Sequence, residues 1–222
     1  MALRARPEKM ENVMQRRHWM LGACLIGMTL LAPALRAEPL APDAFVRQIS
    51  TEVIDAVKAD KAIQGGDVNR IRSLVDAKVM PYVNFPRMTA SSVGPQWRSA
   101  TPDQQKRMLE EFKTMMVNTY SGALTQVKDQ AVMVKPLRAG AADSGELVVR
   151  TEVKGQGDPI QLDYRLEKAG DGWKIYDVNV GGFWLVEAYR GQFAKDLSAG
   201  GMDALIKRLS DKNKSLATSP KS

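Results

Sequence analysis

Side chains that could perform acid–base or nucleophilic chemistry are few in this chain of 222 residues. Asp177 follows Tyr176 directly, and Tyr164 lies in the preceding run of alternating apolar and polar residues. A carboxylate–phenol pair between Asp177 and either tyrosine could exchange a proton with an apolar ligand, so a small α+β enzyme is one interpretation. The other interpretation is structural: an aspartate with no histidine or cysteine beside it more often caps or pairs.

The first 37 residues have the pattern of a secretory signal peptide. Arg16 and Arg17 precede an uninterrupted apolar run over residues 19–31, and small residues follow. The run is shorter than a typical membrane-spanning helix. We place cleavage after Ala37, with residues 32–34 as the alternative site, and therefore expect a periplasmic protein that begins at Glu38.

Three further features of this leader remain as alternatives. Met14 is a candidate start of translation, because residues 1–13 add nothing that a signal peptide needs. Residues 21–24 resemble a lipoprotein box ending at Cys24, but most of the apolar run follows that cysteine. A twin-arginine signal at residues 16–17 matches its surroundings poorly.

Cleavage removes the single histidine, His18, and the single cysteine, Cys24. The mature chain therefore has no disulfide, thiol nucleophile, Ser-His triad or ordinary zinc site. Residues 1–37 also hold six basic and two acidic side chains, so their loss lowers the formal charge from +7 to +3. A charge this small gives little support for nucleic-acid binding.

Helical periodicity predicts helices on both sides of a strand-rich segment. Thr101-Pro102-Asp103-Gln104 is a capping-box start, and Asp67 is a candidate N-cap. The predicted helices cover residues 39–60, 67–81, 101–122, 183–193 and 203–209, with short helical turns over residues 82–97. The polar residues 210–222 are expected to be disordered, which leaves one domain over residues 38–209.

Alternation of apolar and polar side chains predicts four strands. They cover residues 131–137, 147–153, 160–167 and 173–180. The links between them are short enough for hairpins. Gly181-Gly182 then predicts a strand-to-helix turn. The expected fold is α+β, with a twisted antiparallel sheet of about four strands covered by helices on one face.

Several short motifs resemble the MlaC family, the periplasmic phospholipid-carrying components of the Mla lipid transport system, also called toluene-tolerance auxiliary proteins. The resemblance covers almost the whole mature chain in the right order. The motifs are Met80-Pro81-Tyr82-Val83, Val93-Gly94, Trp97-Arg98-Ser99-Ala100-Thr101-Pro102, the helix over Phe112–Tyr120, Leu162-Asp163-Tyr164 and Tyr176-Asp177-Val178.

The resemblance implies an apolar lipid pocket between the sheet and the helices. It implies a monomer that carries phospholipid between an outer-membrane lipoprotein–porin complex and an inner-membrane ABC transporter with an MCE-domain subunit. The implied role of this transport is to maintain outer-membrane lipid asymmetry. Phospholipid is then cargo, and no cofactor is expected. One departure is Gly181-Gly182-Phe183-Trp184, where the family has Glu-Gly-aliphatic-Ser, so pocket depth or the geometry of its lip can differ.

A pocket that carries phospholipid has to keep the acyl tails out of water. Two tails of roughly fifteen methylenes each represent about 24 kcal/mol of hydration cost at about 0.8 kcal/mol per methylene. We expect Phe183→Glu to abolish loading, because it places a carboxylate against hydrocarbon. Arg87 or Arg98 could contact the head group, although solvated surface charge is the simpler interpretation. The residues expected to contact acyl tails are Tyr82, Phe85, Met88, Trp97, Phe112, Met116, Tyr120, Val149, Tyr164, Val178, Val180 and Phe183.

Overall fold

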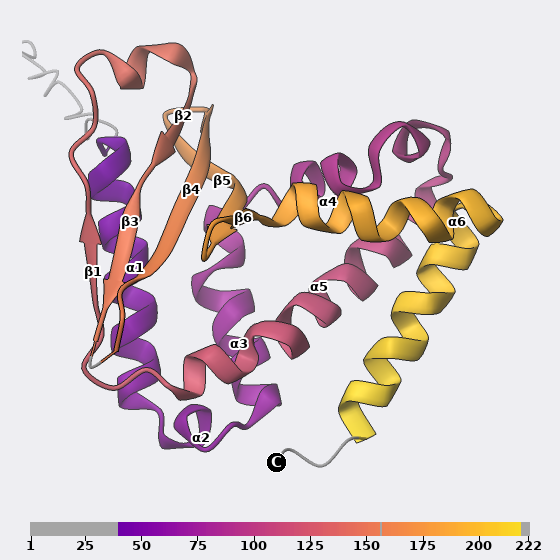
Figure 1. Cartoon of the computed structure of the whole chain (residues 1–222), viewed down its shortest axis with the longest axis horizontal. Helices are drawn as coiled ribbons and strands as arrows, with labels where there is room; N and C mark the ends of the chain where they lie inside the picture. Colours follow the sequence, from indigo (N-terminus) through magenta and orange to yellow (C-terminus); the bar gives the residue numbers. More distant parts are fainter. Residues whose placement is uncertain (1–39, 156, 219–222) are drawn as a thin grey trace, which may run out of the picture. The chain divides into compact units, whose positions relative to one another are not determined.

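The computed structural model describes residues 40–155 and 157–218, and the expected signal peptide lies outside them (Figure 1). Within these residues the helices are α1 (Pro42–Ala59), α2 (Lys61–Gln64), α3 (Val68–Lys78), α4 (Phe85–Val93), α5 (Pro102–Thr125) and α6 (Leu185–Thr218). The strands are β1 (Ala131–Val134), β2 (Glu146–Val149), β3 (Thr151–Lys154), β4 (Ile160–Ala169), β5 (Gly172–Val180) and β6 (Phe183–Trp184). Short 3₁₀ helices cover Met80–Tyr82, Gly94–Ser99 and Ala141–Ser144.

The helix starts follow the local sequence signals. The Asp67 carboxylate accepts hydrogen bonds from the backbone N–H groups of Asn69 and Arg70, which begins α3. Thr101 and Gln104 form the predicted capping box at the start of α5. Both caps satisfy backbone donors that a helix N-terminus leaves without partners, so these predictions are confirmed.

The sheet is antiparallel and has six strands rather than about four. The predicted strand over residues 147–153 is broken at Arg150 into β2 and β3, and both halves pair with β4. At the break, the Asp163 carboxylate accepts the backbone N–H of Thr151 at 3.0 Å. Because this side chain replaces a ladder hydrogen bond, the strand is interrupted without leaving a buried donor unpaired. The predicted α+β class is confirmed.

A bulge at Tyr176 shifts the phase of β5. Arg165 pairs with Asp177 while the next residue, Leu166, pairs with Ile175, so Tyr176 is the extra residue. Trp173 and Ile175 before the bulge therefore share a face with Val178 and Val180 after it. That face, which α1 covers, is called the inner face; the opposite one is the outer face (Figure 1). Side chains on the outer face include those of Met133, Glu146, Val148, Arg150, Asp163, Arg165, Glu167 and Asp177.

The prediction that Gly181-Gly182 leads directly into a helix is wrong. These glycines have φ values of 60° and 96° and form a hairpin turn, after which Phe183 and Trp184 pair back along β5 as β6. The α6 helix begins only at Leu185. The Arg165 guanidinium lies 4.0 Å from the centre of the Trp184 ring, a cation–π contact that stabilises this short strand.

The α6 helix is bent at Gly200-Gly201 and continues to Thr218 (Figure 1). Gly201 has a φ of 65°, which favours glycine. Beyond the bend, the buried Asn213 side chain donates to the Glu111 carboxylate at 2.7 Å and to its backbone carbonyl at 2.9 Å. The structure therefore differs from the disorder expected after residue 209: residues 210–218 are helical because they pack on α5.

Three buried apolar clusters hold the elements together. The first joins α4, α5 and α6 around Phe112, whose ring contacts those of Phe85, Tyr189 and Phe193 at centroid distances of 5.0–5.5 Å. The second joins α1 to the inner face of the sheet, and the third joins α1, α2, α3 and α5. No helix within residues 40–155 and 157–218 is long and apolar enough to cross a bilayer.

Candidate functional site

The inner face of β4 changes from buried to exposed along its length. Leu166 is fully buried beneath α1, Tyr164 and Leu162 are partly buried, and Ile160 is 56% exposed. All four side chains point to one face because strand residues alternate. The strand therefore carries a continuous apolar row with one dry end and one wet end.

The same change is repeated on the neighbouring strands. Trp173 and Ile175 are buried, Val178 and Val180 are partly buried, and Phe183, which pairs with Val180, is 74% exposed. Ile160, Leu162, Val180 and Phe183 together form what we call the open end of the inner face. An exposed apolar surface of this kind marks a place where a partner or ligand binds more often than an ordinary surface does.

Two side chains of α5 pack against the same cluster as part of this surface. Met116 and Tyr120 are partly buried and pack against the first cluster, as do Val178 and Val180. Methionine is flexible, so this wall can adapt to an irregular apolar ligand. Deeper on the inner face, the Tyr164 hydroxyl hydrogen-bonds Ser50 of α1, and burial raises the pKa of Tyr164 to about 12. The phenol is therefore neutral at physiological pH.

The twelve residues expected to contact acyl tails fall into distinct environments. Partly buried residues on or beside the inner face are Tyr82, Met116, Tyr120, Tyr164, Val178 and Val180. Fully packed cluster residues are Phe85, Met88, Phe112 and Val149. Trp97 lies at the edge of the first cluster, and Phe183 is exposed at the open end. The four packed residues could reach a ligand only if helices moved away from them.

Two residues of the open end, Ile160 and Leu162, are absent from the set named from the sequence. The alternation of β4 was itself sufficient to find them, since it places both on the same face as Tyr164. Their exposure depends on how far other elements cover that end of the sheet. Periodicity within one strand carries no information about that.

Asp177 is used for structure. One carboxylate oxygen accepts the backbone N–H groups of Val178 and Val186 at 2.9 and 3.0 Å, and the other accepts Arg165 at 2.9 Å. Burial raises the pKa of Asp177, and these three donors oppose the rise. The carboxylate thus ties β5 to the first turn of α6.

Neither tyrosine proposed as a partner for Asp177 is in place for proton exchange with it. Tyr164 is on the inner face and bonds Ser50, whereas Asp177 is on the outer face. Tyr176 donates to the Glu146 carboxylate at 3.0 Å. The structure therefore does not bring together the carboxylate–phenol pair.

Arg87 lies on the outer side of the sheet and is held by carboxylates. It pairs with Glu146 at 2.8 Å and with Glu167, and its guanidinium lies 3.7 Å from the centre of the Tyr176 ring. Burial lowers the pKa of Arg87, but the bonds to the two glutamates outweigh it and the pKa is raised. Arg98 lines a pocket of about 410 Å³ with Arg87, Trp97 and Arg190.

In the part of the chain that the structure describes, no cluster of three or more His, Cys, Asp or Glu side chains could hold a metal ion. The side chains of the open end are hydrocarbon or aromatic. What this surface can do is adsorb an apolar group.

Two known proteins are similar to this chain along most of its length. The chain is similar to the toluene tolerance protein ttg2D of Pseudomonas putida, with 28% identity over 180 residues that cover 79% of this chain and 83% of the relative. It is 21% identical over 202 residues to the intermembrane phospholipid transport system binding protein MlaC of Haemophilus influenzae, covering 89% of this chain and 94% of the relative.

A solved structure is also similar. It is a phospholipid-binding protein from Ralstonia solanacearum in complex with a phospholipid, with 40% identity and a TM-score of 0.78. The match covers 81% of this chain and all of that one. The family model described as MlaC protein matches residues 47–211, which is most of the sequence. This chain belongs to the MlaC protein family.

Proposed function

We propose that the protein is a phospholipid carrier whose open end, formed by Ile160, Leu162, Val180 and Phe183, admits acyl tails to the inner face of the sheet. The single observation that carries this proposal is the apolar row of β4, which runs from buried Leu166 to exposed Ile160. The Ralstonia solanacearum relative was solved with a phospholipid, which supports the same ligand class here.

The site is suited to reversible binding of tails. Its walls are apolar and contain Met116, and burial of hydrocarbon needs no directional contact. A carrier has to match the apolar environment of a bilayer closely, because each methylene left in water costs about 0.8 kcal/mol. Binding rather than catalysis is the role that this surface supports.

The cellular role that we propose is the one that the MlaC family implies. We propose a monomer that is exported to the periplasm and carries phospholipid between an outer-membrane lipoprotein–porin complex and an inner-membrane ABC transporter with an MCE-domain subunit, maintaining outer-membrane lipid asymmetry. The name of the Haemophilus influenzae relative, an intermembrane phospholipid transport system binding protein, supports this role.

The test compares charge on the two faces of the sheet. Ile160→Asp and Phe183→Glu place a carboxylate at the open end, whereas Met133→Asp places one on the outer face at a side chain of comparable exposure, 49%. Since all three residues are exposed, the fold should tolerate each change. Phospholipid extracted from each purified protein is measured by mass spectrometry.

We expect phospholipid in the wild type and in Met133→Asp, and at least a tenfold loss in the two open-end variants, because a carboxylate against hydrocarbon is costly. Full loading of both open-end variants would refute the placement of the tails. Absence of lipid from the wild type in a gentle preparation would refute carriage.

A further inference from the structure

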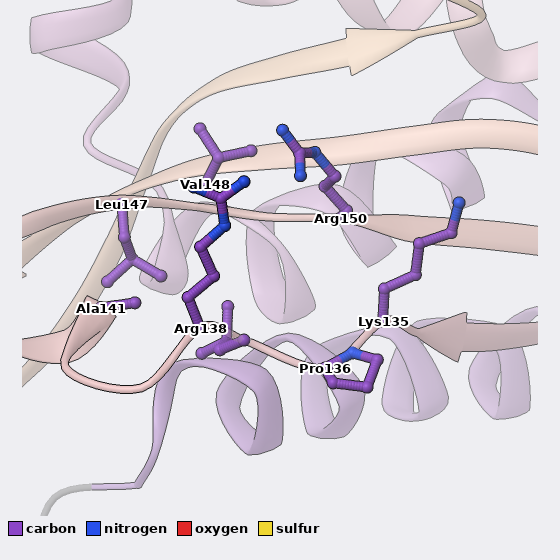
Figure 2. Close-up of a pocket in the computed structure, with 8 residues that line it drawn as sticks. Lys135, Pro136, Arg138, Ala141, Leu147, Val148 and Arg150 are labelled. Carbon is purple, nitrogen blue, oxygen red and sulfur yellow. The ribbon is translucent and has the colours of Figure 1, made fainter.

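A second pocket lies between the β1–β2 connection and strand β2, and its volume is about 410 Å³. Three cationic side chains line it, from Lys135, Arg138 and Arg150. Figure 2 shows them extending to the same side of the chain. The rest of the lining is uncharged and mostly apolar, and includes Leu137 and Leu147. Its size is within the range of about 300–1,000 Å³ that is common for ligand sites.

The charges in this pocket are poorly compensated. Lys135 pairs with Glu152 at 2.6 Å, but Arg138 and Arg150 make no ion pair within residues 40–155 and 157–218. The two arginines elsewhere on this side of the sheet are matched: Arg87 has two glutamates, and Arg165 has Asp177 and Glu187. Because like charges repel at short range, an anion bound between Arg138 and Arg150 would lower the free energy of the pocket.

The arginines could bind either a phosphate or a carboxylate, and the apolar groups beside them favour a membrane phosphate. Guanidinium groups bind phosphate through paired hydrogen bonds, and two of them can hold one phosphate from two sides. The outer face beside the pocket also exposes Met133 and Val148, which are 49% and 38% exposed. An acidic protein side chain would satisfy the arginines but would leave these apolar groups without a partner. A phospholipid head group at a membrane surface can satisfy both, since apolar side chains can enter the region just below the phosphates.

We propose that this pocket receives the phosphate of an anionic phospholipid head group when the protein lies on a membrane surface. The contact uses the edge of the sheet at β2 together with the outer-face residues Val148 and Arg150, and is separate from the tail-binding open end of the inner face. It does not depend on the proposed carrier function. It gives the protein an orientation on the bilayer in which the outer face is toward the head groups.

The experiment measures sedimentation of the mature chain with two kinds of vesicle at low salt: phosphatidylglycerol mixed with phosphatidylcholine, and phosphatidylcholine alone. The test variant is Arg138→Gln/Arg150→Gln. The control is Lys106→Gln/Lys195→Gln, which removes the same charge from exposed positions on α5 and α6. Inorganic phosphate and polyglutamate are each added as competitors.

We expect binding to the phosphatidylglycerol vesicles that weakens with salt, and a loss of about 25-fold in the test variant, at about fivefold per arginine. The control should lose less than about threefold. Equal losses in both variants, equal binding to both vesicles, or no binding would overturn the proposal. Inhibition by polyglutamate but not by phosphate would identify an acidic protein as the occupant and overturn it as well. Unchanged phospholipid content of the test variant separates this site from the tail surface.

Discussion

The buried Asp177 carboxylate makes three interactions that substitution can separate. One oxygen accepts two backbone N–H groups, from Val178 and Val186, and the other accepts Arg165. Asp177→Ala removes all three, whereas Asp177→Asn keeps an oxygen for the two N–H groups and turns an amide N–H toward the guanidinium. The pair of variants therefore distinguishes the backbone cap from the ion pair.

The magnitudes follow from burial. Asp177 is fully buried, and each buried N–H left without a partner costs about 1–3 kcal/mol. Arg165 is partly exposed and keeps Glu187, so its loss of a partner adds less than in a fully buried pair. We expect Asp177→Ala to lower the free energy of unfolding by about 3–5 kcal/mol. Asp177→Asn should lower it by about 1.5–3 kcal/mol, the range for a bond to a charged group.

Urea denaturation followed by circular dichroism measures these free energies. The double variant Asp177→Asn/Arg165→Met removes the guanidinium that faces the amide, and should recover part of the loss. If Asp177→Asn is as damaging as Asp177→Ala, or if Asp177→Ala loses less than about 1 kcal/mol, the capping role is wrong. Phospholipid content that falls in Asp177→Asn with the fold intact would place this residue in ligand binding instead.

Two further predictions concern the outer face and the bend in α6. The hydrogen bond from Arg87, and to a smaller extent the one from Tyr176, holds the pKa of Glu146 below its usual 4.5. The stability that Glu146 contributes is therefore complete above about pH 4.5 and is lost as the pH falls through the folded-state pKa. The melting temperature of Glu146→Gln should therefore lie below that of the wild type at pH 7, and the difference should shrink below pH 4.5; a constant difference would contradict this. Gly201→Ala should lower the free energy of unfolding by about 1–2 kcal/mol, because φ is 65° at that position. The control Gly191→Ala lies in a regular helical turn with open space, so it should raise the free energy of unfolding by about 0.5–1 kcal/mol. Equal effects of the two variants in urea denaturation would count against a glycine-dependent bend.

Local signals predicted the parts of the fold that depend on neighbouring residues. The Thr101 capping box is set by four consecutive residues, and the face of each side chain on β4 is set by alternation alone. For the same reason, Tyr164 was correctly placed on an apolar face. These features need no knowledge of the rest of the chain.

Features that depend on distant partners were not predicted. The break at Arg150 requires the Asp163 side chain to compete for a ladder hydrogen bond, and the helix beyond Ser210 requires Asn213 to reach Glu111. The bulge at Tyr176 brings Asp177 to Arg165. In the candidate site, the extent to which each apolar residue is covered depends on elements distant in sequence, so the sequence identified the apolar side chains but not their exposure.

The change from a dry end to a wet end along β4 has a consequence for kinetics. A hydrocarbon chain sliding from Ile160 toward Leu166 would leave water about one methylene at a time. Each increment is worth about 0.8 kcal/mol, close to thermal energy, so no single step resembles pulling a whole tail into solvent. Entry and exit along such a slope are reversible where each carbon that leaves the sheet passes to another apolar surface, with no dedicated energy source inside the protein itself.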